Sequence, residues 1–148
     1  MATVSTGPLR LFALFANKVV PMSNDLTLLV ARILLALMFI ISGVPILLAP
    51  GGFAGYMGAV GLPAPLLITW VVIAVKLLGG LSVLLGFKTR YGAYALAAFA
   101  IGSALIGHMN WADMNEFNSF FKNLALAGGF LALSVAGPGS ISLDGKRD

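Results

Sequence analysis

A lysine in the middle of an apolar stretch is the residue with the clearest chemical potential in this sequence. Lys76 lies within the segment from about Leu66 to Phe87, roughly 15 Å from either end if that segment is helical. A cation near the bilayer centre costs about 2.5–3.5 kcal/mol and usually faces the interior of a helix bundle. Candidate partners are Ser42, Thr69 and carbonyls freed near Pro45. Two interpretations are open: Lys76 donates to an oxygen of a bound ligand, or it binds bundle carbonyls or a partner subunit's acid.

A second candidate is His108, the single histidine, near the end of a later apolar segment. One histidine cannot ligate haem on both faces, and its spacing to Asp113 and Glu116 matches no ordered metal motif, so we predict no metal site. Histidine changes protonation near neutral pH. A proton or ligand role and a capped histidine at the membrane interface are both open.

Other polar residues flank the apolar segments. Lys122 and Asn123 begin the last of them, where an antiparallel neighbour would bring them close to His108. Together with Trp111 they predict a polar pocket rim, and an anchoring belt of Trp and Lys is the alternative. Arg32 lies two turns inside the first apolar segment, and we expect its side chain to reach lipid headgroups.

The composition shows what must surround these residues. Hydrophobic residues make up 59% of the 148-residue chain and charged residues 9%, whereas a soluble domain carries about 25% charge. Because so few charges cannot cover a water-facing surface, we expect lipid to cover most of the protein's surface. The nine cations form no cluster with aromatics, which argues against nucleic acid.

Turn residues divide the apolar sequence into four candidate spans, at about 26–48, 66–87, 91–109 and 118–136. The expected fold class is therefore all-α: a polytopic four-transmembrane-helix bundle with short interfacial helices. One such helix is expected at Leu9 to Val20 within an N-terminal arm (1–25), with a loosely ordered arm as the alternative. Phe53, Tyr56 and Met57 predict a second interfacial segment. The transmembrane domain would cover 26–137 and a polar tail 138–148.

The distribution of Lys and Arg predicts the orientation. With four spans, six cations fall on one side: Arg10, Lys18, Lys88, Arg90, Lys146 and Arg147. The cation-rich side is cytoplasmic, so both termini are expected inside. Helix contacts are expected at small residues: Ser42-Gly43, Gly79-Gly80, Gly102-Ser103 and Gly128-Gly129.

The chain also resembles a known family. The segments Phe53-Ala54-Gly55-Tyr56, Gly61-Leu62-Pro63-Ala64-Pro65 and Leu77-Leu78-Gly79-Gly80, followed by His108, Phe121 to Leu126, Gly137-Pro138-Gly139 and Ser142-Leu143-Asp144, are similar to the DoxX family of small bacterial membrane proteins. The resemblance covers about residues 26–144 and implies a four-helix membrane fold in the cytoplasmic (inner) membrane of a bacterium. Family members have been linked to quinol oxidase and thiosulfate:quinone oxidoreductase assemblies and to complexes handling thiol and oxidative stress.

The sequence departs from that family at two positions. The family commonly has a Lys shortly after the Ser-Gly of the first span, and Ile46 occupies that place here. It commonly has a Glu just before Leu-Leu-Gly-Gly, and Lys76 occupies that place. If these two positions normally pair, this protein holds one unmatched cation instead.

Three hypotheses for the function follow. The first is an accessory membrane subunit of a respiratory or redox complex that contacts quinone or lipid. The second is a ligand-free structural or assembly protein, which includes self-association. The third is a small-molecule transporter, which is disfavoured because no inverted repeat is visible. We expect no catalytic activity from the chain itself and no cofactor held within it, and the lack of cysteine excludes iron–sulfur or Cys-x-x-Cys chemistry.

Overall fold

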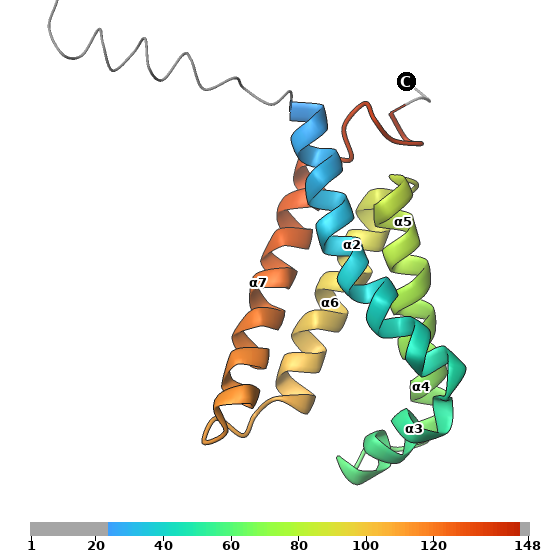
Figure 1. Cartoon of the computed structure of the whole chain (residues 1–148), viewed down its shortest axis with the longest axis vertical. Helices are drawn as coiled ribbons and strands as arrows, with labels where there is room; N and C mark the ends of the chain where they lie inside the picture. Colours follow the sequence, from blue (N-terminus) through green and yellow to red (C-terminus); the bar gives the residue numbers. More distant parts are fainter. Residues whose placement is uncertain (1–23, 146–148) are drawn as a thin grey trace, which may run out of the picture.

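The structure is a computed structural model that describes residues 24–145 (Figure 1). Within that range the chain is helical and forms no strand, which confirms the all-α prediction there. The predicted interfacial helix at Leu9 to Val20 lies outside the described residues. In chain order the elements are α2 (Asn24–Leu48), α3 (Pro50–Ala59), α4 (Pro65–Ala74), the π-helical segment η1 (Val75–Gly79), α5 (Gly80–Leu85), α6 (Thr89–Gly107) and α7 (Met114–Ala136).

Three helical segments of the described range are long and apolar enough to cross a bilayer. They are Asn24–Leu48, the continuous rod Pro65–Leu85 and Met114–Ala136. Helix α6 has 19 residues and carries Arg90 in its first turn, and it is not one of these three segments. The count of four spans depends on α6 and stays a prediction.

Large apolar side chains face outward over much of the surface. Leu34 is 68% exposed, Leu78 68% and Val135 82%. In water these side chains would form extended apolar patches that soluble proteins avoid, whereas hydrocarbon solvates them without cost. The described surface therefore suits a lipid environment.

The buried core lies where α2, α6 and α7 meet. Phe39 of α2 packs edge-on against Phe99 of α6 and Phe130 of α7, with ring centroids 6.0 and 5.3 Å apart. Alanines of α2 and α6, among them Ala36 and Ala97, are buried around these rings. Small side chains at these positions let the helix backbones approach closely enough for the aromatic rings to fill the remaining space.

The second apolar rod contains a local widening that the sequence did not predict. α4 begins at Pro65, whose missing N–H is tolerated in a first turn, and continues without a break through η1 into α5. At Val75–Gly79 the helix is π-helical. Such bulges are rare and often occur at functional sites. This one contains Lys76.

The small residues proposed for helix contacts divide into two groups. An added Cβ would lie 2.8 Å from Leu77 at Gly43, 2.8 Å from Ile40 at Gly80 and 3.2 Å from Leu35 at Gly129, so these glycines do permit close approach. At Gly102 and Gly128 an added Cβ would meet no atom within 4 Å. The packing prediction is wrong for these two positions, because neither lies against a neighbouring helix.

The two ends of the bundle differ. α6 packs along α7 over its length, and it also packs on η1 and α5. At one end of the bundle, α3 and α4 diverge from the α6–α7 pair (Figure 1). We call this the open end. The opposite end, where α2 begins, the turn joins α5 to α6 and residues 138–145 fold back, is called the closed end.

Arg32 is buried at the closed end and does not contact headgroups as expected. Its side chain is 2% exposed, and it donates to four carbonyl oxygens: Nε to Val83 at 3.0 Å, Nη2 to Leu84 at 2.9 Å, and Nη1 to Pro138 at 2.7 Å and Ile141 at 2.9 Å. The headgroup expectation is corrected because the folded-back C-terminal segment supplies acceptors that the rigid guanidinium reaches at once.

The segment 138–145 is thus part of the folded bundle. Asp144 accepts hydrogen bonds from the backbone N–H groups of Lys88 and Thr89 at 3.0 and 3.1 Å, and from the Thr89 hydroxyl at 3.1 Å. It therefore caps the start of α6, where a helix has unsatisfied N–H groups. The Ser140 N–H donates to Asp25 at 2.8 Å, which places both ends of the described chain together.

Candidate functional site

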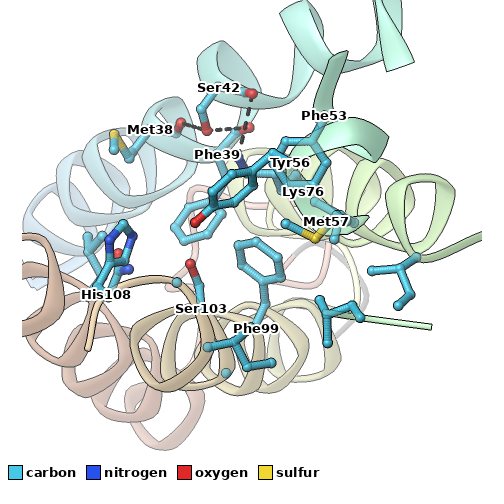
Figure 2. Close-up of a pocket in the computed structure, with 18 of the residues that line it drawn as sticks. Met38, Phe39, Ser42, Phe53, Tyr56, Met57, Lys76, Phe99, Ser103 and His108 are labelled. Atoms are coloured by element: carbon cyan, nitrogen blue, oxygen red, sulfur yellow. Dashed lines mark hydrogen bonds between the residues drawn. The ribbon is translucent and has the colours of Figure 1, made fainter. Parts of the chain in front are cut away.

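A cavity of about 470 Å³ lies toward the open end, between α2, α3, the second rod, α6 and α7 (Figure 2). Its lining is mainly apolar, with a few polar side chains. Such a combination is typical of small-molecule sites, which measure about 300–1,000 Å³. The lining residues are Met38, Phe39, Ser42, Phe53, Tyr56, Met57, Leu62, Ile68, Val72, Lys76, Phe99, Gly102, Ser103, Ile106, Gly107, His108, Lys122, Asn123 and Leu126.

Lys76 is half-buried in this cavity and has little compensation for its charge. Its Nζ donates to the Ser42 carbonyl oxygen at 3.5 Å, at the limit of a hydrogen bond, and lies 5.7 Å from the centroid of the Phe99 ring. Within residues 24–145 it forms no ion pair. Of the expected partners, Ser42 contributes its carbonyl, whereas the Thr69 hydroxyl donates to Pro65 at 2.9 Å instead.

The local backbone explains why Lys76 points here. An added Cβ on Gly43 would lie 3.2 Å from the Lys76 Cβ, so α2 and η1 are nearly in contact at this level. The π-helical turn shifts side chains relative to a regular α-helix. Figure 2 shows Lys76 among Phe39, Tyr56 and Phe99, beneath the Ser42 backbone.

His108 and Glu116 form a pair at the cavity mouth. His108 follows the last residue of α6 and Glu116 lies in the first turn of α7, with Nδ1 and Oε2 2.7 Å apart. Their side chains are 26% and 33% exposed. Asp113 caps α7 by accepting from the Asn115 N–H at 2.8 Å. These bonds fix the connection between α6 and α7, and His108 also lines the cavity.

Only two of the three other predicted rim residues line the cavity. Lys122 and Asn123 line the cavity from α7. Trp111 does not: its ring packs on Phe120 and Phe121, with centroids 5.2 and 6.4 Å away, and half of it is exposed. The structure therefore brings Lys76, His108, Lys122 and Asn123 to one cavity and leaves Trp111 outside.

Sequence reasoning missed the contribution of α3. The sequence predicts an interfacial segment at Phe53, Tyr56 and Met57, and the structure shows that all three also line the cavity. Their i, i+3, i+4 spacing does predict a shared helix face, although it does not reveal what that face meets. Gly102 and Ser103 were expected at a helix contact and instead form cavity wall. The hydroxyls of Tyr56 and Ser103 form no hydrogen bond with any residue of the described range.

Comparison with known proteins settles the family. The DoxX family model matches residues 27–109, which span α2 to α6 and most of the cavity wall. This chain belongs to the DoxX family. It is 38% identical over 128 residues to inner membrane protein YphA of Escherichia coli K12, covering 82% of this chain and 91% of that protein. It is 40% identical over 121 residues to inner membrane protein YqjF of the same strain, covering 82% and 92%.

No solved structure matches the chain. The resemblance drawn from short motifs is confirmed, and this DoxX-family chain is a membrane protein. The family match ends at Met109. The wall supplied by α7, including Lys122 and Asn123, is therefore known here from the structure alone.

Proposed function

We propose that this DoxX-family protein is an accessory subunit of the bacterial inner membrane that binds an apolar, oxygen-bearing molecule of the quinone class and serves a redox complex. The observation that carries this proposal is Lys76, an ammonium group in an apolar cavity whose hydrogen-bond acceptor within the described range is one carbonyl oxygen at 3.5 Å. A ligand oxygen would supply a shorter acceptor in a medium where an unpaired cation is costly.

The rest of the cavity suits a ring with polar substituents. Phe39 and Phe99 offer aromatic surfaces beside Lys76, and the Tyr56 and Ser103 hydroxyls offer further donors (Figure 2). His108 directly follows the end of α6, nine residues beyond Phe99, and a helical rise over that separation is roughly 13 Å. An elongated molecule could thus have one oxygen near Lys76 and another polar group near the mouth.

The membrane topology belongs to the same proposal. The chain would cross four times, with α6 as the third span and both termini cytoplasmic. The hydrogen bond from Ser140 to Asp25 supports an even number of crossings, since it holds the start of α2 beside the segment that follows α7. The charged turn at Lys88 and Arg90 lies at that same closed end, as the positive-inside rule requires of a cytoplasmic side.

Ligand extraction tests the binding proposal. The full chain, purified from bacterial membranes in mild detergent, should yield about one extractable quinone per chain, and Lys76→Met should retain less than a tenth of it. Lys88→Gln removes the same charge at the closed end and should retain the wild-type amount. Equal quinone in wild type and Lys76→Met, or none in either, would overturn the proposal. Redox subunits should co-purify with the wild type.

Cysteine labelling tests the topology. The chain has no cysteine, so single substitutions Ser140→Cys and Ala112→Cys report on each end separately. In intact cells a membrane-impermeant maleimide should label Ala112→Cys and leave Ser140→Cys unlabelled until the cells are permeabilised. Labelling of Ser140→Cys in intact cells would contradict cytoplasmic termini.

A further inference from the structure

A second hollow lies on the lipid-facing surface near the closed end, away from the cavity just described. It measures about 570 Å³ and runs between the η1–α5 part of the second rod and α6. Its walls are Leu78 and Leu81 on one rod and Tyr91 and Ala95 on the other. Nothing in the quinone proposal uses this surface.

The groove exists because two glycines form its floor. An added Cβ on Gly92 would lie 3.2 Å from the Gly79 carbonyl oxygen and 2.5 Å from the Ser82 Oγ, so the two backbones are nearly in contact there. The flanking side chains stand outward on either side: Leu78 is 68% exposed and Tyr91 75% exposed. The result is a channel with a smooth floor and apolar walls.

The dimensions of the groove match one leaflet. Its lining extends from Ala74 to Leu85 on the second rod, about 16 Å at 1.5 Å per residue. The hydrocarbon core of a bilayer is about 30 Å thick, so one leaflet contributes about 15 Å. An acyl chain that enters at the level of the α5–α6 turn would end near η1.

A cation stands at the mouth of the groove. Lys88 lines it, and its Nζ lies 5.8 Å from the centroid of the Phe87 ring. The nearby carboxylate of Asp144 is engaged with the backbone N–H groups of Lys88 and Thr89 and with the Thr89 hydroxyl. Arg90 adds a second cation in the same turn, with its Nε donating to Ser134 at 3.1 Å. The mouth therefore has an excess of positive charge, which favours an anionic group.

We propose that this groove binds an anionic phospholipid, with one acyl chain along the glycine floor and the phosphate beside the Lys88 ammonium. The inference is independent of the quinone proposal, because no residue is shared between the two hollows. The length of the groove indicates the length of the acyl chain, and the charge of Lys88 indicates an anionic headgroup.

Native mass spectrometry of the full chain in mild detergent tests this inference, with phosphatidylglycerol and phosphatidylcholine of identical acyl chains as probes. Wild type should retain phosphatidylglycerol more strongly than phosphatidylcholine. Lys88→Gln should lower phosphatidylglycerol retention about fivefold, which corresponds to about 1 kcal/mol for one cation at a membrane surface. Ala95→Phe fills the groove without changing the charge and should lower retention of both lipids.

Lys122→Gln is the matched control, since it removes one cation at the open end and should leave phosphatidylglycerol retention unchanged. An equal loss in Lys122→Gln and Lys88→Gln would show that net charge alone sets the preference and would overturn the site. Unchanged retention of both lipids in Ala95→Phe would do the same. Conversion of a wild-type dimer to a monomer by Ala95→Phe, with no lipid retained by either form, would assign the groove to a second copy of this chain instead.

Discussion

The two ends of this bundle differ in how completely a cation inside the protein is hydrogen-bonded. At the closed end, Arg32 donates to four carbonyl oxygens at 2.7–3.0 Å and is 2% exposed. Toward the open end, Lys76 has one carbonyl at 3.5 Å and the edge of a large cavity. The first cation is saturated by its own chain and therefore stabilises the fold. The second is not saturated within the described range, which agrees with our proposal that Lys76 binds a ligand oxygen.

The largest expected effect is the loss of the arginine at the closed end. Arg32→Met should lower the free energy of unfolding by about 3–5 kcal/mol, because four carbonyls lose their donor and the 138–145 segment is released. The melting temperature in mild detergent, followed by tryptophan fluorescence, measures this. Arg90→Met, which removes a side chain with one carbonyl bond from the same end, should cost about 1 kcal/mol. Equal losses of stability in the two variants would show that Arg32 stabilises the fold no more than Arg90 does.

The matching substitution near the open end should have the opposite sign. Lys76→Met should leave the ligand-free protein as stable as wild type or raise its free energy of unfolding by about 1–3 kcal/mol, because the variant avoids the cost of placing a cation in an apolar environment. The same melting experiment on delipidated protein checks it. A clear drop in melting temperature would mean that Lys76 serves structure as Arg32 does, and the contrast between the two ends would fail.

Backbone contact supplies the next effect. Gly92→Ala should destabilise by about 1–3 kcal/mol, because its new Cβ would press on Ser82 and Gly79 and push the second rod away from α6. Gly128→Ala is the matched control, with no atom within 4 Å of the added Cβ, and it should be neutral or slightly stabilising. Thermal melting of both variants side by side distinguishes a tight helix contact from a general intolerance of alanine.

The smallest effect concerns the cap on α6. Asp144→Ala should lower the free energy of unfolding by about 1 kcal/mol, the usual loss for a capping side chain. It should also increase hydrogen exchange at Lys88 and Thr89, whose N–H groups donate hydrogen bonds to Asp144. Asp113→Ala removes the corresponding cap of α7 at the open end and should raise exchange at Asn115 instead. Exchange that rises at both ends in either variant would contradict two separate caps.

Much of the site could be read from the sequence because rare residues in an apolar chain are informative. Lys76, His108, Lys122 and Asn123 stood out as polar groups at or between apolar segments, and all four line one cavity. Trp111 was placed with them on proximity in the chain, yet aromatic contacts with Phe120 and Phe121 hold it elsewhere. The partner of a residue depends on how its neighbours pack, which adjacency in sequence does not determine.

The sequence by itself determined that this is a helical membrane protein of the DoxX family, because apolar length, turn residues and short motifs act locally along the chain. Only the tertiary structure decided where Arg32 finds its acceptors, some of them 106 and 109 positions away. It also decided that Gly102 and Ser103 border a cavity and that Lys76, which lies in η1, lines the same cavity. Long-range contacts of this kind follow from the packing of whole helices, and similar runs of small and apolar residues can fill either a contact or a cavity wall.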